Sequence, residues 1–137
     1  MSRELVKCAN EFNSIIARFI LDLVRAYPDD PVVLKLRKNF SLAQSQFPAK
    51  LLTVIGRKLD EYVDQINELC ETGDFGPFLE VEFEEINDSP DAENINYILQ
   101  RIKQIASQLD KDKSRKYIDD IGNLLELYYV SCKGEEN

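Results

Sequence analysis

The stretch LVKCANEFNSIIARFILDLVRAYPDDP, residues 5–31, decides the fold class. Its large apolar side chains recur at steps of three and four residues, the spacing that places them on one face of an α-helix. These side chains are Leu5, Cys8, Phe12, Ile15, Ile16, Phe19 and Leu23. Further apolar residues widen this face, so the sequence predicts a central helix from about Arg3 to Tyr27 that other helices contact from several sides.

Prolines and glycines divide the rest of the chain into further helices. Asp30-Pro31 supplies an N-cap followed by a proline at the first helical position, and Pro48 restarts the chain at a similar position. Gly73 is placed to end the third helix, and Asp88-Ser89-Pro90 opens the fourth. Gly56 inside the third helix indicates close helix packing or a kink. With a polar turn over 110–113, the predicted helices cover about residues 3–27, 31–45, 48–71, 88–109 and 114–132.

The predicted fold class is all-α, an up-and-down bundle of about five helices. Short connections between helices favour antiparallel neighbours, and apolar residues three and four apart are typical of the seams between such helices. Phe47, after the second helix, is expected to point inward. We expect one helical domain over residues 1–132 and a flexible tail over residues 133–137.

An acidic extended insert interrupts the helical pattern between the third and fourth helices, over about residues 72–89. From Leu79 to Glu84, apolar residues alternate with glutamates, which is the period of a β-strand. A single strand has no pairing partner in an otherwise helical chain. Two interpretations stay open: an extended loop held to the bundle by its aromatic residues, or an arm that docks on a partner protein.

Charge is divided between two adjoining blocks. Residues 31–59 carry six bases and no acid, and residues 60–94 carry thirteen acids and no base. The net charge of −8 over 137 residues therefore conceals a strongly dipolar chain. The boundary falls inside the predicted helix 48–71, which has bases first and acids second. Because that order opposes the helix macrodipole, helix stability does not explain it.

Three interpretations of these blocks stay open. The acidic segment folds back on the basic block, or it receives a partner protein with a basic surface, or the basic block contacts phosphate or nucleic acid against the repulsion of the neighbouring acids. The candidate partner-binding residues are Phe75, Phe78, Leu79, Glu80, Val81, Glu82, Phe83, Glu84 and Glu85. The alternative phosphate-binding residues are Lys35, Arg37, Lys38, Lys50, Arg57 and Lys58.

Composition excludes several kinds of chemistry. The sequence has no His, which removes His general bases, Ser–His and Cys–His nucleophile pairs and His metal ligands. Cys8, Cys70 and Cys132 lack metal-ligand or redox spacing, so we expect free thiols that act as small apolar side chains. No phosphate-binding or calcium-binding loop motif occurs. We therefore expect no catalytic residue, no metal and no cofactor.

The N-terminus and the apolar runs bear on the compartment. The first residues lack the apolar core of a signal peptide, and the run Ile15–Val24 is too short and too charged to span a membrane. We expect an intracellular protein with no membrane contact. Tyr128, Tyr129 and Val130 place apolar residues on more than one side of the last helix, which allows a homo-oligomer.

Four features together resemble a known group of proteins. They are Phe12–Ile20 leading into Tyr27–Asp30, the segment Phe47–Leu52, the insert Phe75–Ile86, and the helix pair Ile98–Leu109 and Tyr117–Tyr129. The chain resembles small acidic helical proteins encoded by large double-stranded DNA viruses of algae and protists. That group has no established activity, so the resemblance implies only a setting: host cytoplasm, viral replication compartment or virion.

The sequence thus favours a non-enzymatic protein–protein interaction or assembly protein. It would dock through the acidic aromatic insert and the charge-split helix on a protein with a basic surface. The alternatives are a nucleic-acid accessory protein that uses the basic block over 35–58, and an enzyme with an unrecognised carboxylate site.

Overall fold

The computed structural model describes residues 3–75 and 92–133, and within these ranges the chain is all-α. It forms six α-helices there and no strand. The helices are α1 (Arg3–Ala26), α2 (Pro31–Gln46), α3 (Pro48–Glu61), α4 (Val63–Thr72), α7 (Ala92–Ser107) and α8 (Lys111–Tyr128), followed by one π-helical turn, η1 (Tyr129–Lys133). The predicted all-α class is therefore confirmed.

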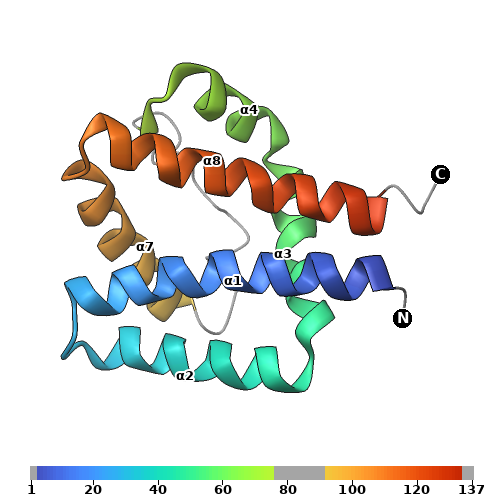
Figure 1. Cartoon of the computed structure of the whole chain (residues 1–137). Helices are drawn as coiled ribbons and strands as arrows, with labels where there is room; N and C mark the ends of the chain where they lie inside the picture. Colours follow the sequence, from blue (N-terminus) through green and yellow to red (C-terminus); the bar gives the residue numbers. More distant parts are fainter. Residues whose placement is uncertain (1–2, 76–91, 134–137) are drawn as a thin grey trace.

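The helices do not form a simple up-and-down bundle. Figure 1 shows α2, α1, α8 and α4 side by side in that order, while α3 and α7 run across them. Only Phe47 separates α2 from α3. One residue is too short a connection to turn α3 back alongside α2, so α3 instead crosses α1 and α8. An amphipathic pattern specifies the buried face of a helix but leaves the crossing angle open.

The segment 48–71, predicted as one helix, forms two helices, because the helix is interrupted at Tyr62. The break lies close to the change in charge. Lys58 is in the last turn of α3, and Asp64 is in the first turn of α4. Each charge has the sign that the dipole of its own helix favours. The break relieves only part of the predicted conflict with the macrodipole, because Asp60 and Glu61 in the last turn of α3 and Glu71 in the last turn of α4 still oppose it.

The predicted helix boundaries at Asp30-Pro31, Pro48 and Gly73 are confirmed, and the one at Asp88-Ser89-Pro90 lies outside the described residues. The Asp30 carboxylate accepts hydrogen bonds from the backbone N–H groups of Val32 (3.0 Å) and Val33 (3.3 Å), with Pro31 as the first residue of α2. Gly73 ends α4 in the left-handed conformation, with φ of 70°. The polar turn expected over 110–113 is shorter than predicted. Asp110 is an N-cap whose carboxylate accepts from Lys113 N–H at 2.8 Å, and α8 begins at Lys111.

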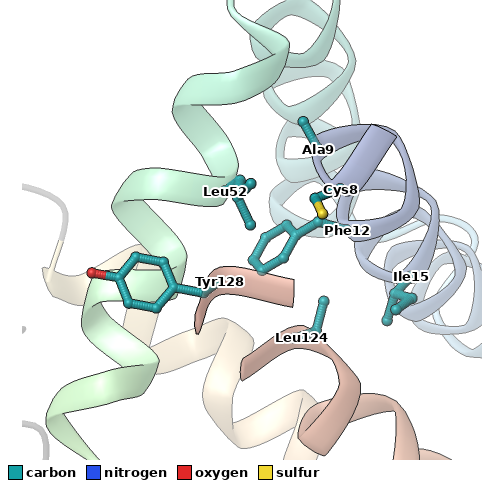
Figure 2. Close-up of a cluster of buried hydrophobic side chains, with 7 residues drawn as sticks. All are labelled: Cys8, Ala9, Phe12, Ile15, Leu52, Leu124 and Tyr128. Carbon is teal, nitrogen blue, oxygen red and sulfur yellow. The ribbon is translucent and has the colours of Figure 1, made fainter. Parts of the chain in front are cut away.

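The core is organised around α1, as its wide apolar face predicted. Figure 2 shows one buried cluster, in which the Phe12 side chain projects from α1 toward α3 and α8. Its members are Cys8, Ala9, Phe12, Ile15, Leu52, Leu124 and Tyr128. The second cluster joins α1 to α2 through Ile20, Leu23, Val24, Val33 and Phe40.

Of two expectations about individual side chains, the one for the cysteines is confirmed and the one for Phe47 is wrong. All three cysteines are free thiols, with Cys8 buried and Cys70 and Cys132 half-buried. Phe47 does not point inward, because 57% of it is exposed. It is the residue that joins two crossing helices, so its side chain lies at an outer corner of the fold.

Candidate functional site

Most of the predicted partner-binding segment lies outside the described residues. This applies to Phe78, Leu79, Glu80, Val81, Glu82, Phe83, Glu84 and Glu85. The first member, Phe75, is described and half-buried, and it lies at the wall of an apolar cavity. The structure therefore places one end of the predicted segment beside the helical core.

Three carboxylates of α4 form an acidic surface. Asp64, Glu68 and Glu71 are all exposed, and their spacing of four and three residues places them on one side of the helix. None of the three forms an ion pair with another described residue. We call these three residues the acidic surface.

All six residues predicted as the alternative phosphate-binding set are exposed. Lys35, Arg37 and Lys38 lie on α2, and Lys50, Arg57 and Lys58 lie on α3. Lys58 contacts Glu61 at 3.7 Å, and the Lys50 ammonium lies 5.4 Å from the centre of the Phe47 ring. The remaining four form no ion pair with described residues, so their charges face solvent.

Sequence reasoning missed the apolar residues that accompany these bases. On α3, Phe47, Lys50, Val54 and Arg57 follow one another at steps of three, four and three residues, so they line one side of the helix. Phe47 is 57% exposed and Val54 is 51% exposed. We call these four residues the α3 stripe.

A cavity of about 370 Å³ lies between α1, α7 and α8. Its walls are almost wholly apolar and include Phe19, Leu23, Leu99, Ile102, Leu109 and Ile121. Two charged side chains, Asp22 and Lys103, also reach it. The Asp22 carboxylate accepts a hydrogen bond from the Tyr117 hydroxyl, and the stacked rings of Tyr117 and Phe19 lie 5.3 Å apart.

A polar cluster fixes α7 against the corner between α1 and α2. The Arg101 guanidinium lies 4.9 Å from the Tyr27 ring centre and 4.6 Å from the Tyr97 ring centre, and its Nε lies 3.5 Å from an Asp30 oxygen. The Tyr97 hydroxyl donates to Asp30, and Arg101 donates to Tyr97 at 2.7 Å. Gln104 accepts from Tyr27 at 2.6 Å. The hydrogen bond from Tyr97, aided by the backbone of α2 and by Arg101, lowers the pKa of Asp30.

Two tyrosines have strongly shifted acidities. Burial and the hydrogen bond to Asp22 raise the pKa of Tyr117 to about 12. The hydrogen bond to Asp60, together with burial, raises the pKa of Tyr129 to about 12. In both cases ionisation of the phenol would place a second negative charge beside a carboxylate. Each tyrosine therefore acts as a neutral donor that ties α8 or η1 to another helix.

The described residues offer little catalytic machinery. Within 3–75 and 92–133, no group of three or more His, Cys, Asp or Glu side chains is placed to hold a metal ion. Among the described residues that line the cavity, Asp22 is the one carboxylate. Among these same residues, no helix has the length and hydropathy of a membrane span.

Comparison with known proteins gave no relative. No protein-family model matches the sequence, and no curated protein and no solved structure matches it either.

Proposed function

We propose that this protein is a non-enzymatic protein–protein interaction or assembly protein. It docks through the exposed side of α3 that carries the α3 stripe and through the acidic surface of α4, together with the segment Phe75–Glu85. Its partner carries a basic surface that complements the carboxylates. The observation that supports this most strongly is the α3 stripe, with two large apolar side chains more than half exposed between unneutralised bases.

Neither group of charges is needed to hold this fold together. The acidic surface makes no ion pair with the described residues, and the unpaired bases face solvent. Exposed charges of this kind contribute little to stability, typically below about 1 kcal/mol even when paired. They do raise association rates and select partners of complementary charge. Exposed apolar residues rimmed by charge are likewise typical of interaction sites.

The test is affinity purification with cross-linking from the native cell, using variants that remove one group at a time. The first variant neutralises the acidic surface (Asp64→Asn, Glu68→Gln, Glu71→Gln), and the second neutralises Glu80, Glu82, Glu84 and Glu85. A third removes the exposed apolar side chains of the α3 stripe (Phe47→Ser, Val54→Ser). The matched control neutralises Glu4, Glu11 and Glu126, which are exposed acids elsewhere.

We expect the first three variants to lose the same cross-linked partner while their melting temperatures stay within a few degrees of the wild type. The control should recover it in full. Identical sets of recovered proteins from all five proteins would refute the proposal.

One observation keeps a second function open, namely binding of nucleic acid. The helices α2 and α3 carry six exposed bases, and neither helix contains an acidic residue before Asp60. This alternative predicts binding to DNA or RNA that weakens steeply as salt rises. Changing Lys35, Lys38 and Arg57 to glutamine should then reduce both the affinity and its salt dependence. No mobility shift at low salt would exclude it.

The proposal also includes the location of the complex. The resemblance to proteins of large DNA viruses supports a complex that forms in an infected cell or in the virion. Cross-linking from infected cells and from purified particles, compared side by side, distinguishes these two locations.

A further inference from the structure

The cavity between α1, α7 and α8 shares one residue, Phe75, with the docking segment proposed above, and none with the α3 stripe or the acidic surface. Its volume of about 370 Å³ lies within the range of small-molecule sites, toward the lower end. Its walls are mainly aliphatic and aromatic side chains of α1, α7 and α8, and Leu36 of α2, Leu59 of α3 and Phe75 also line it. A site of this size suits one aliphatic chain better than a two-chain lipid.

The charged side chains at the cavity wall indicate which charge a bound ligand would carry. Of the two charged side chains at its wall, Asp22 already accepts the Tyr117 hydroxyl, and it lies 3.9 Å from the Arg25 guanidinium. Lys103 is half-buried and forms no ion pair with a described residue. The cavity therefore combines an apolar interior with one ammonium group at its wall that no described carboxylate pairs with. That combination complements an anionic head group on an apolar chain.

The packing of α7 also leaves room for such a ligand. One side of α7 is fixed by the Arg101 cluster with Asp30 and Tyr97. None of the described side chains of α7 is fully buried, and Ile102 at the cavity wall is 42% exposed. A bound aliphatic chain would cover apolar surface that the described helices leave accessible, which favours binding by the hydrophobic effect.

We propose that this cavity binds a single-chain amphiphile with a carboxylate head group, such as a medium-chain fatty acid, and that Lys103 pairs with the carboxylate. The chain then lies among Phe19, Leu23, Leu99 and Ile121. Lys103 acts as a positioning and specificity residue, because the apolar walls alone do not distinguish an acid from an alcohol.

The probe is dodecanoate, added to the full-length protein below its micelle-forming concentration and followed by titration calorimetry and native mass spectrometry. Dodecanol and dodecyltrimethylammonium have the same chain with a neutral and a cationic head. We expect one dodecanoate per protein, with dodecanol bound at least tenfold more weakly and the cationic probe weaker again.

Two variants and one control decide the assignment. Lys103→Met keeps an apolar stem without the charge and should weaken dodecanoate at least tenfold, to the level of dodecanol. Lys113→Met makes the same charge change at an exposed position on α8 and should leave binding unchanged. Ala106→Phe places a ring at the cavity wall and should weaken both probes, with circular dichroism checking that the fold is kept.

Two results would overturn the inference. One is the absence of a one-to-one complex with dodecanoate, which is what a cavity already filled by the chain's own side chains would give. The other is equal dodecanoate affinity for the wild type and Lys103→Met. Neither result bears on the docking surfaces, so the two proposals fail separately.

Discussion

The backbone of Gly56 on α3 packs directly against the Tyr128 ring on α8. A Cβ atom at position 56 would lie 2.4 Å from Cδ1 and 2.6 Å from Cγ of that ring, closer than carbon atoms approach one another. Figure 2 shows the Tyr128 ring lying against α3, beside the cluster that contains Phe12. Of the two roles that the sequence left open for Gly56, close packing is the one observed. The break between helices lies at Tyr62 instead.

Gly56→Ala should therefore destabilise the fold although alanine is the better helix former. Overpacking in a core typically costs about 1–3 kcal/mol. The gain in helix propensity offsets only about 1 kcal/mol of that cost. We expect the free energy of unfolding, measured by urea denaturation, to fall by up to about 2 kcal/mol.

Gly122→Ala is the matched control, because Gly122 also lies inside a helix. Its added Cβ would be 3.4 Å from the Cys70 sulfur, which is ordinary contact. We expect no loss of stability, or a gain of up to about 1 kcal/mol from propensity. Equal effects of the two substitutions would show that the Tyr128 ring moves aside freely.

Asp30 should contribute more to stability than a helix cap alone. Asp110 caps α8, whereas Asp30 caps α2, accepts from Tyr97 and pairs with Arg101. Asp110→Ala should cost about 1 kcal/mol, the usual cost of a lost cap. Asp30→Ala should cost more and should also release α7, seen as faster amide hydrogen exchange in α7 than in α8. Equal exchange rates in α7 for both variants would contradict this role.

The charge of Asp30 also predicts a pH dependence. Folding lowers the pKa of Asp30 from its ordinary value of 3.8, so the ionised form is the one that the fold favours. Its contribution is therefore present above that ordinary value and is lost as pH falls through the lower, folded value. Asp30→Asn keeps a capping side chain without the charge. The difference in melting temperature between wild type and this variant should be constant at neutral pH and shrink in acid.

Tyrosine titration tests the links that hold α8 and η1. Folding raises the pKa of Tyr117 and Tyr129 from 10.0 to about 12, so their contribution to stability is present below pH 10 and is lost as pH rises from 10 to 12. Absorbance of tyrosinate should show a late phase with a midpoint near pH 12. Tyr117→Phe and Tyr129→Phe should each remove part of that phase. A late phase that survives in the double variant would refute the assignment.

Thiol reactivity should separate Cys8 from the other two cysteines. Cys8 is 7% exposed, and burial together with nearby Glu4 and Glu11 raises the pKa of its thiol. Because the thiolate is the reactive form, Cys8 should react slowest with a disulfide reagent under native conditions. Cys70 and Cys132 are half-buried and should react first. Cysteine-to-serine variants, taken one at a time, identify each phase.

Much of the fold follows from local signals in the sequence. The three- and four-residue apolar pattern located α1 to within a residue, and Asp30-Pro31 and Gly73 marked helix ends that the structure confirms. The break at Tyr62 could not be predicted, because Asp60 to Asp64 contains neither proline nor glycine. The crossing of α3 depends on the single residue between α2 and α3, which no apolar pattern encodes.

Less of the candidate sites than of the fold could be predicted from the sequence. The exposure of the bases on α2 and α3 could be predicted, because long charged side chains are rarely buried. The exposure of Phe47 and Val54 was not predicted, since it depends on which helix covers which face. The Arg101 cluster joins residues from two distant parts of the chain, 27–30 and 97–104, with Tyr97 lying 67 positions from Asp30. No local pattern brings such residues together.

The central claim is that exposed charge at the junction of α3 and α4 binds a partner. The most direct measurement is the affinity of the purified cross-linked partner for the wild type, for the variant lacking the charges of Asp64, Glu68 and Glu71, and for the control lacking those of Glu4, Glu11 and Glu126. We predict at least a tenfold weaker affinity for the first variant, an unchanged affinity for the control, and equal melting temperatures for all three. Equal affinities for the wild type and the first variant would contradict the claim.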